Sequence, residues 1–161
     1  MAAADLVLRD AQLVRLSLGK TIAVARADEL LYRRAGGQFE ARNVRATLLP
    51  GPQAHALESF GAVEVKAELL VGEELQDGAH TTAITRGEGG VSARAARGDW
   101  AHGESVVWNG KSGLLVSDAP VTLSGPNYSM RGGSLKASAD GQQFELGHGA
   151  QGTLSRSQGT R

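Results

Sequence analysis

The 161-residue sequence contains no cysteine and carries no net charge. The absence of cysteine excludes disulfide bonds and every thiolate-based reaction or metal site. The 17 Lys and Arg residues are balanced by 17 Asp and Glu residues. Proteins that bind nucleic acid need a basic surface to displace counterions from phosphate, so this balance argues against a nucleic-acid partner.

Aromatic residues and long apolar runs are also scarce. Aromatic side chains make up 4% of the sequence, so a core must be built mainly from Val, Leu and Ala. No apolar run approaches the roughly 20 residues of a transmembrane helix. The start, Met1-Ala2-Ala3-Ala4, lacks the basic and apolar regions of a signal peptide. It fits a cytosolic protein, or one whose targeting segment is missing from this chain.

No catalytic arrangement is recognisable. The four histidines are scattered among expected loops, and no two have metal-ligand spacing on one element. The run Gly87–Gly90 lacks the Lys-Ser/Thr of a phosphate-binding loop, and Ser105 is not in a nucleophile elbow. We therefore predict no catalytic residue, no metal site and no cofactor, and we expect a binding or structural role.

Glycine is abundant, with 22 residues, and it separates short stretches of alternating apolar and polar residues. Pro120–Leu154 predicts four or five short strands, and Val63–Leu69 predicts a longer, half-buried strand. Hairpin turns are expected at Gly36-Gly37, Asn109-Gly110 and Asp140-Gly141, because apolar alternation flanks each dipeptide. The pattern predicts an all-β protein.

The remainder of the chain fits the same class. Leu6–Leu8 and Leu13–Leu18 predict two short strands with a break between them. Ala25–Arg34 has helical propensity, but we interpret it as a strand with a bulge near Asp28-Glu29. Gly72–Gly90 is polar and rich in Gly and Thr, so we expect a turn, a strand and a second turn there. We expect a single domain over residues 1–161.

The order and spacing of these motifs resemble one known family. A weak internal repeat places Ala-Arg-Ala before an aromatic residue, a glycine turn and an apolar arm, once in each half of the chain. The chain resembles the periplasmic lipopolysaccharide-transport proteins with an OstA-like β-jellyroll, most closely the LptC type and secondly the LptA type. The likeness covers Leu6 to Leu154 and is carried by Gly19, Ala25, Ala27, Tyr32, Ala93–Trp108, Pro120-Val121, Gly132–Leu135, Asp140-Gly141 and Phe144–Leu146.

The resemblance implies a fold, a function and a location. The fold is a single twisted antiparallel β-jellyroll with an apolar interior groove. The function is non-enzymatic binding of lipopolysaccharide in the export bridge that builds the outer membrane. Lipid arrives from the subunits of an inner-membrane ABC transporter and passes to an LptA-like protein. LptC-type proteins are held in the inner membrane by an N-terminal helix, which is missing from this chain, and they function in the periplasm.

We predict a lipid-binding groove lined by one face of successive strands. An apolar groove suits acyl chains because each buried methylene contributes roughly 0.8 kcal/mol. The alternative for any one residue is that it packs only against other core residues. The predicted lining residues are Val24, Leu30, Phe39, Val65, Leu69, Trp108, Val116, Leu123, Met130, Leu135, Phe144 and Leu146.

We also predict that edge strands at the two ends of the domain bind partners, because unpaired backbone groups are a template for strand addition. By the resemblance, the N-terminal edge meets the transporter and the C-terminal edge meets the LptA-like protein. The same edges allow homo-oligomers. The partner-binding residues are Leu6, Val7, Leu8 and Arg9 at one edge, and Ala150, Gly152, Thr153 and Leu154 at the other.

Two rival functions come from other classes. A self-assembling β-structural protein that forms polymers fits the high glycine content, although a regular six-residue rung is absent. A carbohydrate-binding or hydrolytic jellyroll needs a row of exposed aromatics or paired carboxylates. Trp100 and Trp108 alone are weak support for it.

Overall fold

The computed structural model describes residues 3–17, 19–50, 60–77, 80–138 and 144–154. Every element bounded within these residues is a β-strand, and no helix among them is long and apolar enough to cross a membrane. The strands are β1 (Leu6–Ser17), β2 (Lys20–Arg33), β3 (Gln38–Leu48), β4 (Val63–Asp77), β5 (His80–Ala95), β6 (Trp100–Gly103), β7 (Val106–Asn109), β8 (Leu114–Ser117), β9 (Val121–Gly125), β10 (Tyr128–Gly132), β11 (Ser134–Ser138), β12 (Phe144–Gly147) and β13 (Gln151–Leu154).

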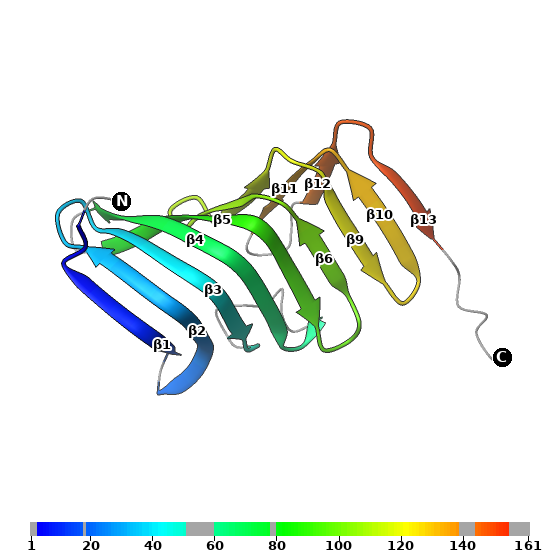
Figure 1. The fold of residues 1–161 in the computed structure, drawn as a ribbon. Helices are drawn as coiled ribbons and strands as arrows, with labels where there is room; N and C mark the ends of the chain where they lie inside the picture. Colours follow the sequence, from blue (N-terminus) through cyan, green and yellow to red (C-terminus); the bar gives the residue numbers. More distant parts are fainter. Residues whose placement is uncertain (1–2, 18, 51–59, 78–79, 139–143, 155–161) are drawn as a thin grey trace.

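The thirteen strands form one antiparallel sheet that does not close into a barrel, consistent with a β-jellyroll-like fold. Figure 1 shows them succeeding one another from β1 at one end of the molecule to β13 at the other. The five long strands β1 to β5 are followed by four pairs of short strands. Each pair, such as β6 with β7, lies beside the two halves of its neighbour. The described chain therefore makes nine antiparallel passes, each crossing the full width of the sheet.

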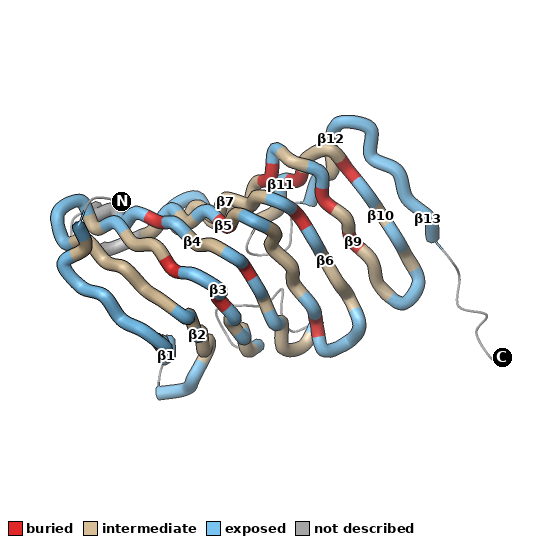
Figure 2. Tube along the Cα trace, viewed as in Figure 1, coloured by how far each residue is buried: buried red, intermediate tan, exposed pale blue. Residues whose placement is uncertain are grey.

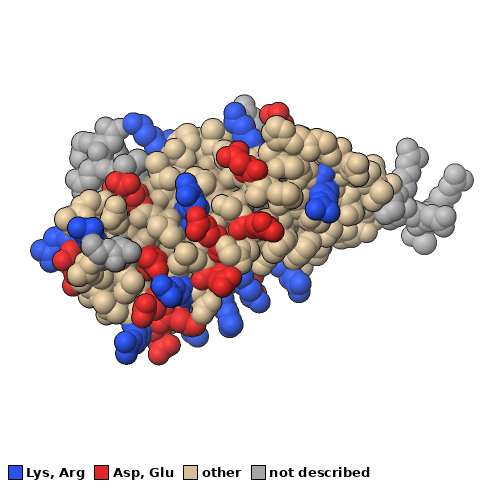
Figure 3. All heavy atoms as spheres, turned by 45° about the horizontal axis from the view of Figure 1, so that its top comes forward, with Lys and Arg blue, Asp and Glu red and all other residues tan. Residues whose placement is uncertain are grey.

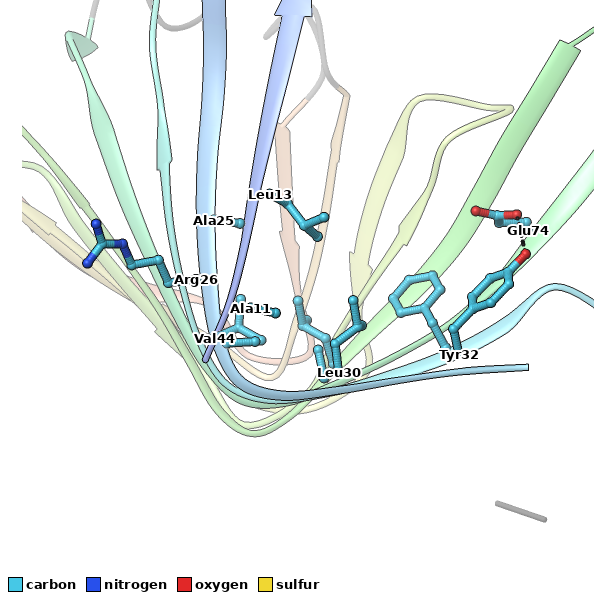
Figure 4. A pocket seen from close by; sticks show the side chains of 12 residues that line it. Ala11, Leu13, Ala25, Arg26, Leu30, Tyr32, Val44 and Glu74 are labelled. Carbon is cyan, nitrogen blue, oxygen red and sulfur yellow. Dashed lines mark hydrogen bonds between the residues drawn. The ribbon is translucent and has the colours of Figure 1, made fainter. Parts of the chain in front are cut away.

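The two halves of the sheet form two walls. Beyond β5, the first wall consists of β6, β9, β10 and β13, and the second wall consists of β7, β8, β11 and β12. Figure 4 looks along the trough between the walls and shows the long strands bent into a V. We call the concave side of this V the inner face. The bend lies at the middle of every pass, so both walls present the same side of the chain to the trough.

The bend interrupts the usual two-residue alternation. A regular strand sends every second side chain to the same face. Across the bend, consecutive inner-face residues are instead three apart, as in Leu8 and Ala11 of β1 or Ala27 and Leu30 of β2. The same spacing recurs at Ala41 with Val44 and at Ala67 with Leu70.

Left-handed backbone at the bend makes this spacing possible in several passes. Asp10 in β1 and Asn43 in β3 have φ angles of 51° and 50°. Asp and Asn tolerate this region better than other residues with a side chain. The amide of Asn43 also donates a 2.8 Å hydrogen bond to the carboxylate of Asp28 on β2. In β5, Gly89 and Gly90 form the bend, and the register with β4 shifts there by one residue.

The walls meet in a packed core near the C-terminal end. Val121, Leu123 and Leu135 form a buried cluster that joins β9 of the first wall to β11 of the second. Val121 is only 3% exposed, and Figure 2 shows buried residues on β9 and β11, whereas β1 is mostly exposed. Gly132 helps the walls to approach, because a Cβ there would lie 3.1 Å from the Cβ of Leu146. Buried side chains therefore join the two walls at this end.

The predicted turns have mixed outcomes. The turn at Gly36-Gly37 is confirmed: it joins β2 to β3 and both glycines have positive φ angles. The hairpin at Asn109-Gly110 is also confirmed, but its loop is longer than two residues. The side-chain oxygen of Asn109 accepts hydrogen bonds from the backbone amides of Lys111 and Ser112, and Gly113 adopts the left-handed conformation in this loop. Asp140-Gly141 lies outside the described residues.

Two strand predictions are wrong. The segments predicted as separate strands around Asp10 form the single strand β1, because Asp10 bends the chain without ending its pairing with β2. Gly72–Gly90 is not a turn-strand-turn passage, since β4 continues to Asp77 and β5 begins at His80. The polar composition suggested turns, but one face of an antiparallel sheet can be exposed to water, so its strands can also be rich in polar residues. The strand predicted over Ala25–Arg34 is confirmed as part of β2 as far as Arg33, where β2 ends.

Candidate functional site

The candidate site is an apolar hollow in the open end of the trough, between the walls formed by β1 to β4. Its volume is about 310 Å³. Figure 4 shows its side chains converging from both arms of the V. The lining residues are Ala11, Leu13, Ala25, Arg26, Ala27, Leu30, Tyr32, Phe39, Ala41, Val44, Leu70 and Glu74.

Polar groups of this lining lie at its margins. The guanidinium of Arg26 points away from the apolar side chains in Figure 4. The hydroxyl of Tyr32 donates a 3.4 Å hydrogen bond to the carboxylate of Glu74, high on one arm of the V. The floor of the hollow, by contrast, consists of aliphatic side chains such as Leu30 and Val44. The hollow is chemically suited to hydrocarbon, with polar atoms available only at its lip.

The apolar surface continues along both walls beyond the hollow. On the first wall, directly paired residues from β1 to β10 are all apolar: Leu13, Ala25, Ala46, Val65, Ala93, Ala101, Leu123 and Met130. On the second wall, the corresponding row runs through Leu6, Tyr32, Phe39, Gly72, Thr85, Trp108, Leu115, Ala137 and Phe144. Neither row contains a charged residue.

Ion pairs lie on the opposite, outer face. Same-strand ion pairs there join residues two apart: Arg42 with Glu40 at 3.1 Å, Lys66 with Glu64 at 3.4 Å and Arg86 with Glu88 at 3.6 Å. Figure 3 shows both signs interleaved over the surface. Exposed pairs of this kind contribute little stability, about 0–1 kcal/mol each. They keep the outer face in water and leave the inner face as the apolar side.

Nine of the twelve predicted groove residues lie on the inner face. Leu30 and Phe39 line the hollow itself. Leu123 and Leu135 belong to the buried cluster, and Met130 and Leu146 pack against it. Val65, Trp108 and Phe144 occupy the apolar rows, although Phe144 is 53% exposed because β12 pairs only with β11.

The inner-face position predicted for Val24, Leu69 and Val116 is wrong. Val24 pairs with Val14 and Thr47 and lies between the inner residues Ala23 and Ala25. Val116 pairs with Val107 and Lys136 on the outer face. Leu69 continues the alternation of β4 in the sequence, but the bend after Ala67 shifts that alternation by one residue.

The prediction also missed inner residues that the structure brings together. Ala11, Ala27, Val44 and Leu70 line the hollow next to the bend. A detectable signal existed, namely apolar residues three apart in the middle of β1, β2, β3 and β4. This signal was hard to recognise because one residue of each pair is alanine, which is only weakly apolar and does not mark one face of a strand clearly.

The predicted partner edges are real edges of the sheet. Within the described part of the chain, β1, which contains Leu6 to Arg9, pairs only with β2. β13, which contains Gly152, Thr153 and Leu154 and follows Ala150, pairs only with β10. The binding of a partner at either edge stays a prediction.

One titratable group is clearly perturbed within the described residues. Burial, together with a 2.6 Å hydrogen bond to the Asp99 carboxylate and the charge of that carboxylate, raises the pKa of Tyr128 to about 12. This tyrosine therefore stays neutral at physiological pH and fastens β10 to the loop before β6. Among the described residues, no group of three or more His, Asp or Glu side chains is placed to hold a metal ion.

No protein-family model matches the chain, and no match was found among curated proteins.

Proposed function

We propose that the protein is a non-enzymatic component of a lipopolysaccharide export bridge in the periplasm. It receives lipid at the open end of the trough from an inner-membrane ABC transporter and passes it to an LptA-like protein. The observation that carries the proposal is the predominantly apolar inner face, which holds a hollow of about 310 Å³ at the end where β1 is exposed. The resemblance in motif order supports the same assignment.

The chemistry of the trough is consistent with an acylated ligand. Burial of hydrocarbon contributes roughly 25 cal/mol per Å², and the inner rows offer apolar contact without charged side chains along the path. Sugar and phosphate groups of such a ligand would remain outside the V. The polar pair Tyr32 and Glu74 at the lip is placed where the apolar part of a ligand ends.

Leu30 and Leu31 provide a matched test, because they are identical neighbours on opposite faces of β2. Leu30 lines the hollow, whereas Leu31 pairs with Val7 and Glu40 on the outer face. A photo-reactive amino acid at position 30 should crosslink added lipopolysaccharide at least tenfold more than the same group at position 31. Leu30→Glu should abolish lipid binding, and Leu31→Glu should leave it within about twofold.

The control is the fold of each variant, followed by circular dichroism in the far ultraviolet. Equal crosslinking at both positions from folded protein would contradict a ligand site in the trough. Crosslinking to phospholipid but not to lipopolysaccharide would retain the site and reject the proposed ligand.

A self-assembling structural protein is the second candidate. It is favoured by the free edges at both ends of the sheet, β1 and β13. Such a protein should form open-ended polymers whose length grows with concentration and without lipid. Sedimentation velocity over a wide concentration range separates the two functions.

A further inference from the structure

β1 is an unusually unprotected edge strand. It has twelve residues with no proline and three charged side chains, and among the described strands it pairs with β2 alone. Both of its faces expose large apolar side chains: Leu13 on the inner face is 56% exposed, and Val14 on the outer face is 51% exposed. Natural edge strands are usually short, charged or interrupted, because a long apolar edge pairs with other chains. β1 is therefore expected to be covered by another strand.

The opposite end of the same molecule is a poor match for β1. β12 and β13 are four-residue strands. All nine passes alternate in direction, so the last pass runs the same way as β1. Stacking molecules end to end would thus form a parallel contact, which is slightly less stable per residue than an antiparallel one. A second β1 related by a two-fold axis at the bend would instead pair antiparallel, over residues 6–13 of each strand.

The sequence of β1 is complementary to itself about the bend. Its inner residues Leu6 and Leu8 precede the bend, and Ala11 and Leu13 follow it at mirrored distances. The centre lies between Arg9 and Asp10, which carry opposite charges. β1 already pairs with β2 in this way, with Leu8 opposite Leu30 and Ala11 opposite Ala27 on either side of the bend.

We propose that β1 pairs with β1 of a second copy of this chain about a two-fold axis at the bend. Leu6 then lies opposite Leu13 of the partner subunit, and Leu8 opposite Ala11 of the partner subunit. Arg9 faces Asp10 of the partner subunit, and symmetry repeats this charge pair. The two V-shaped troughs join at their open ends into one continuous apolar channel. The pairing does not depend on the proposed lipid ligand.

The dimer has a regulatory consequence. A strand has only one free edge once β2 occupies the other, so self-pairing and docking of a different partner at β1 exclude each other. A chain with no other partner bound at β1 would bury the exposed apolar edge of β1 in the dimer.

Complementary charge variants test the pairing. Arg9→Glu places like charges across the axis in both symmetric positions, and Asp10→Lys does the same with cations. Each variant alone should weaken dimerisation about tenfold in analytical ultracentrifugation. An equimolar mixture of the two should recover association near the unmodified level, because each new charge then faces its opposite. Far-ultraviolet circular dichroism checks folding, since Arg9 also pairs with Glu29 within the protomer.

Single cysteines provide an independent test in case Asp10→Lys does not fold at its positive φ angle. The chain has no native cysteine. Leu6→Cys mixed with Leu13→Cys should form a disulfide-linked dimer under mild oxidation. Leu6→Cys mixed with Leu16→Cys, whose positions are not opposed, should give at most a tenth as much. A strictly monomeric chain, a dimer unaffected by Arg9→Glu, or open-ended growth into filaments would each overturn the proposal.

Discussion

The phenol of Tyr128 closes over the hairpin between β9 and β10. Its ring covers Gly125, where an added Cβ would collide with the ring and lie 2.7 Å from the Asp99 carboxylate. The neutral phenol can donate to that carboxylate, whereas a phenolate would be repelled by it. The hydrogen bond therefore links the ionisation of one residue to the stability of the sheet.

This linkage gives a prediction at alkaline pH. The pKa of Tyr128 is raised to about 12 in the folded protein, against about 10 in the unfolded chain. The contribution is fully present below pH 10 and is lost as the pH rises from 10 to 12, because the unfolded state releases its proton first. The absorbance at 295 nm of the protein minus that of Tyr128→Phe should report the shifted titration. Asp99→Asn should lower the pKa; a Tyr128 titration near 10 in the unmodified protein would contradict the account.

At the scale of strand pairs, an aromatic ring compensates for a glycine. Phe39 on β3 lies directly across from Gly72 on β4, and a Cβ on Gly72 would occupy the position of the ring. Gly72 is buried beneath this ring. The glycine thus lets Phe39 lie flat on the neighbouring strand, within the lining of the hollow.

Gly72→Ala should therefore displace the ring and destabilise the protein by about 1–3 kcal/mol. Chemical denaturation in urea measures the loss. Gly19→Ala is unsuitable as a control because of its positive φ angle, but Thr85→Ala, in the next strand of the same row, adds no atoms and should cost less. The double change Phe39→Leu with Gly72→Ala should recover part of the lost stability. No recovery would show that the collision is not the cause.

Element by element, alternation in the sequence was enough to predict strands but not their bends. Met130, Leu135 and Phe144 lie on the predicted face, because short strands between glycine turns leave little room for a change of phase, although Val116 on the short strand β8 lies on the opposite face. Leu69 was misassigned because a long strand can bend and change phase internally. That bend depends on pairing with neighbouring strands, which a single sequence does not display. The hollow next to the bend could not be predicted for the same reason.

At the scale of the whole molecule, stability and ligand capacity occupy different ends of one trough. The packed end contains Leu135, which is 7% exposed and joins the two walls. The open end contains Leu30, which is half-buried and faces the hollow. An identical substitution at the two positions should therefore have different consequences.

Leu135→Ala should lower the free energy of unfolding by about 2–5 kcal/mol, as expected for a buried leucine. Leu30→Ala should cost about 1 kcal/mol, because its side chain already borders open space. Urea denaturation followed by tryptophan fluorescence measures both. A larger loss at Leu30 than at Leu135 would mean that the open end, and not the cluster at β9 and β11, holds the walls together.

The repeated bend has a consequence for how long such a molecule can be. Each of the first four passes carries a bend with a three-residue spacing of inner side chains, and each pairs with the pass before it. Adding or removing one hairpin of two passes would keep the direction of the final strand and change only the length of the trough, by about 9–10 Å. A chain with this architecture can therefore be lengthened by whole hairpins to span a longer distance, while the V-shaped cross-section of the sheet stays the same.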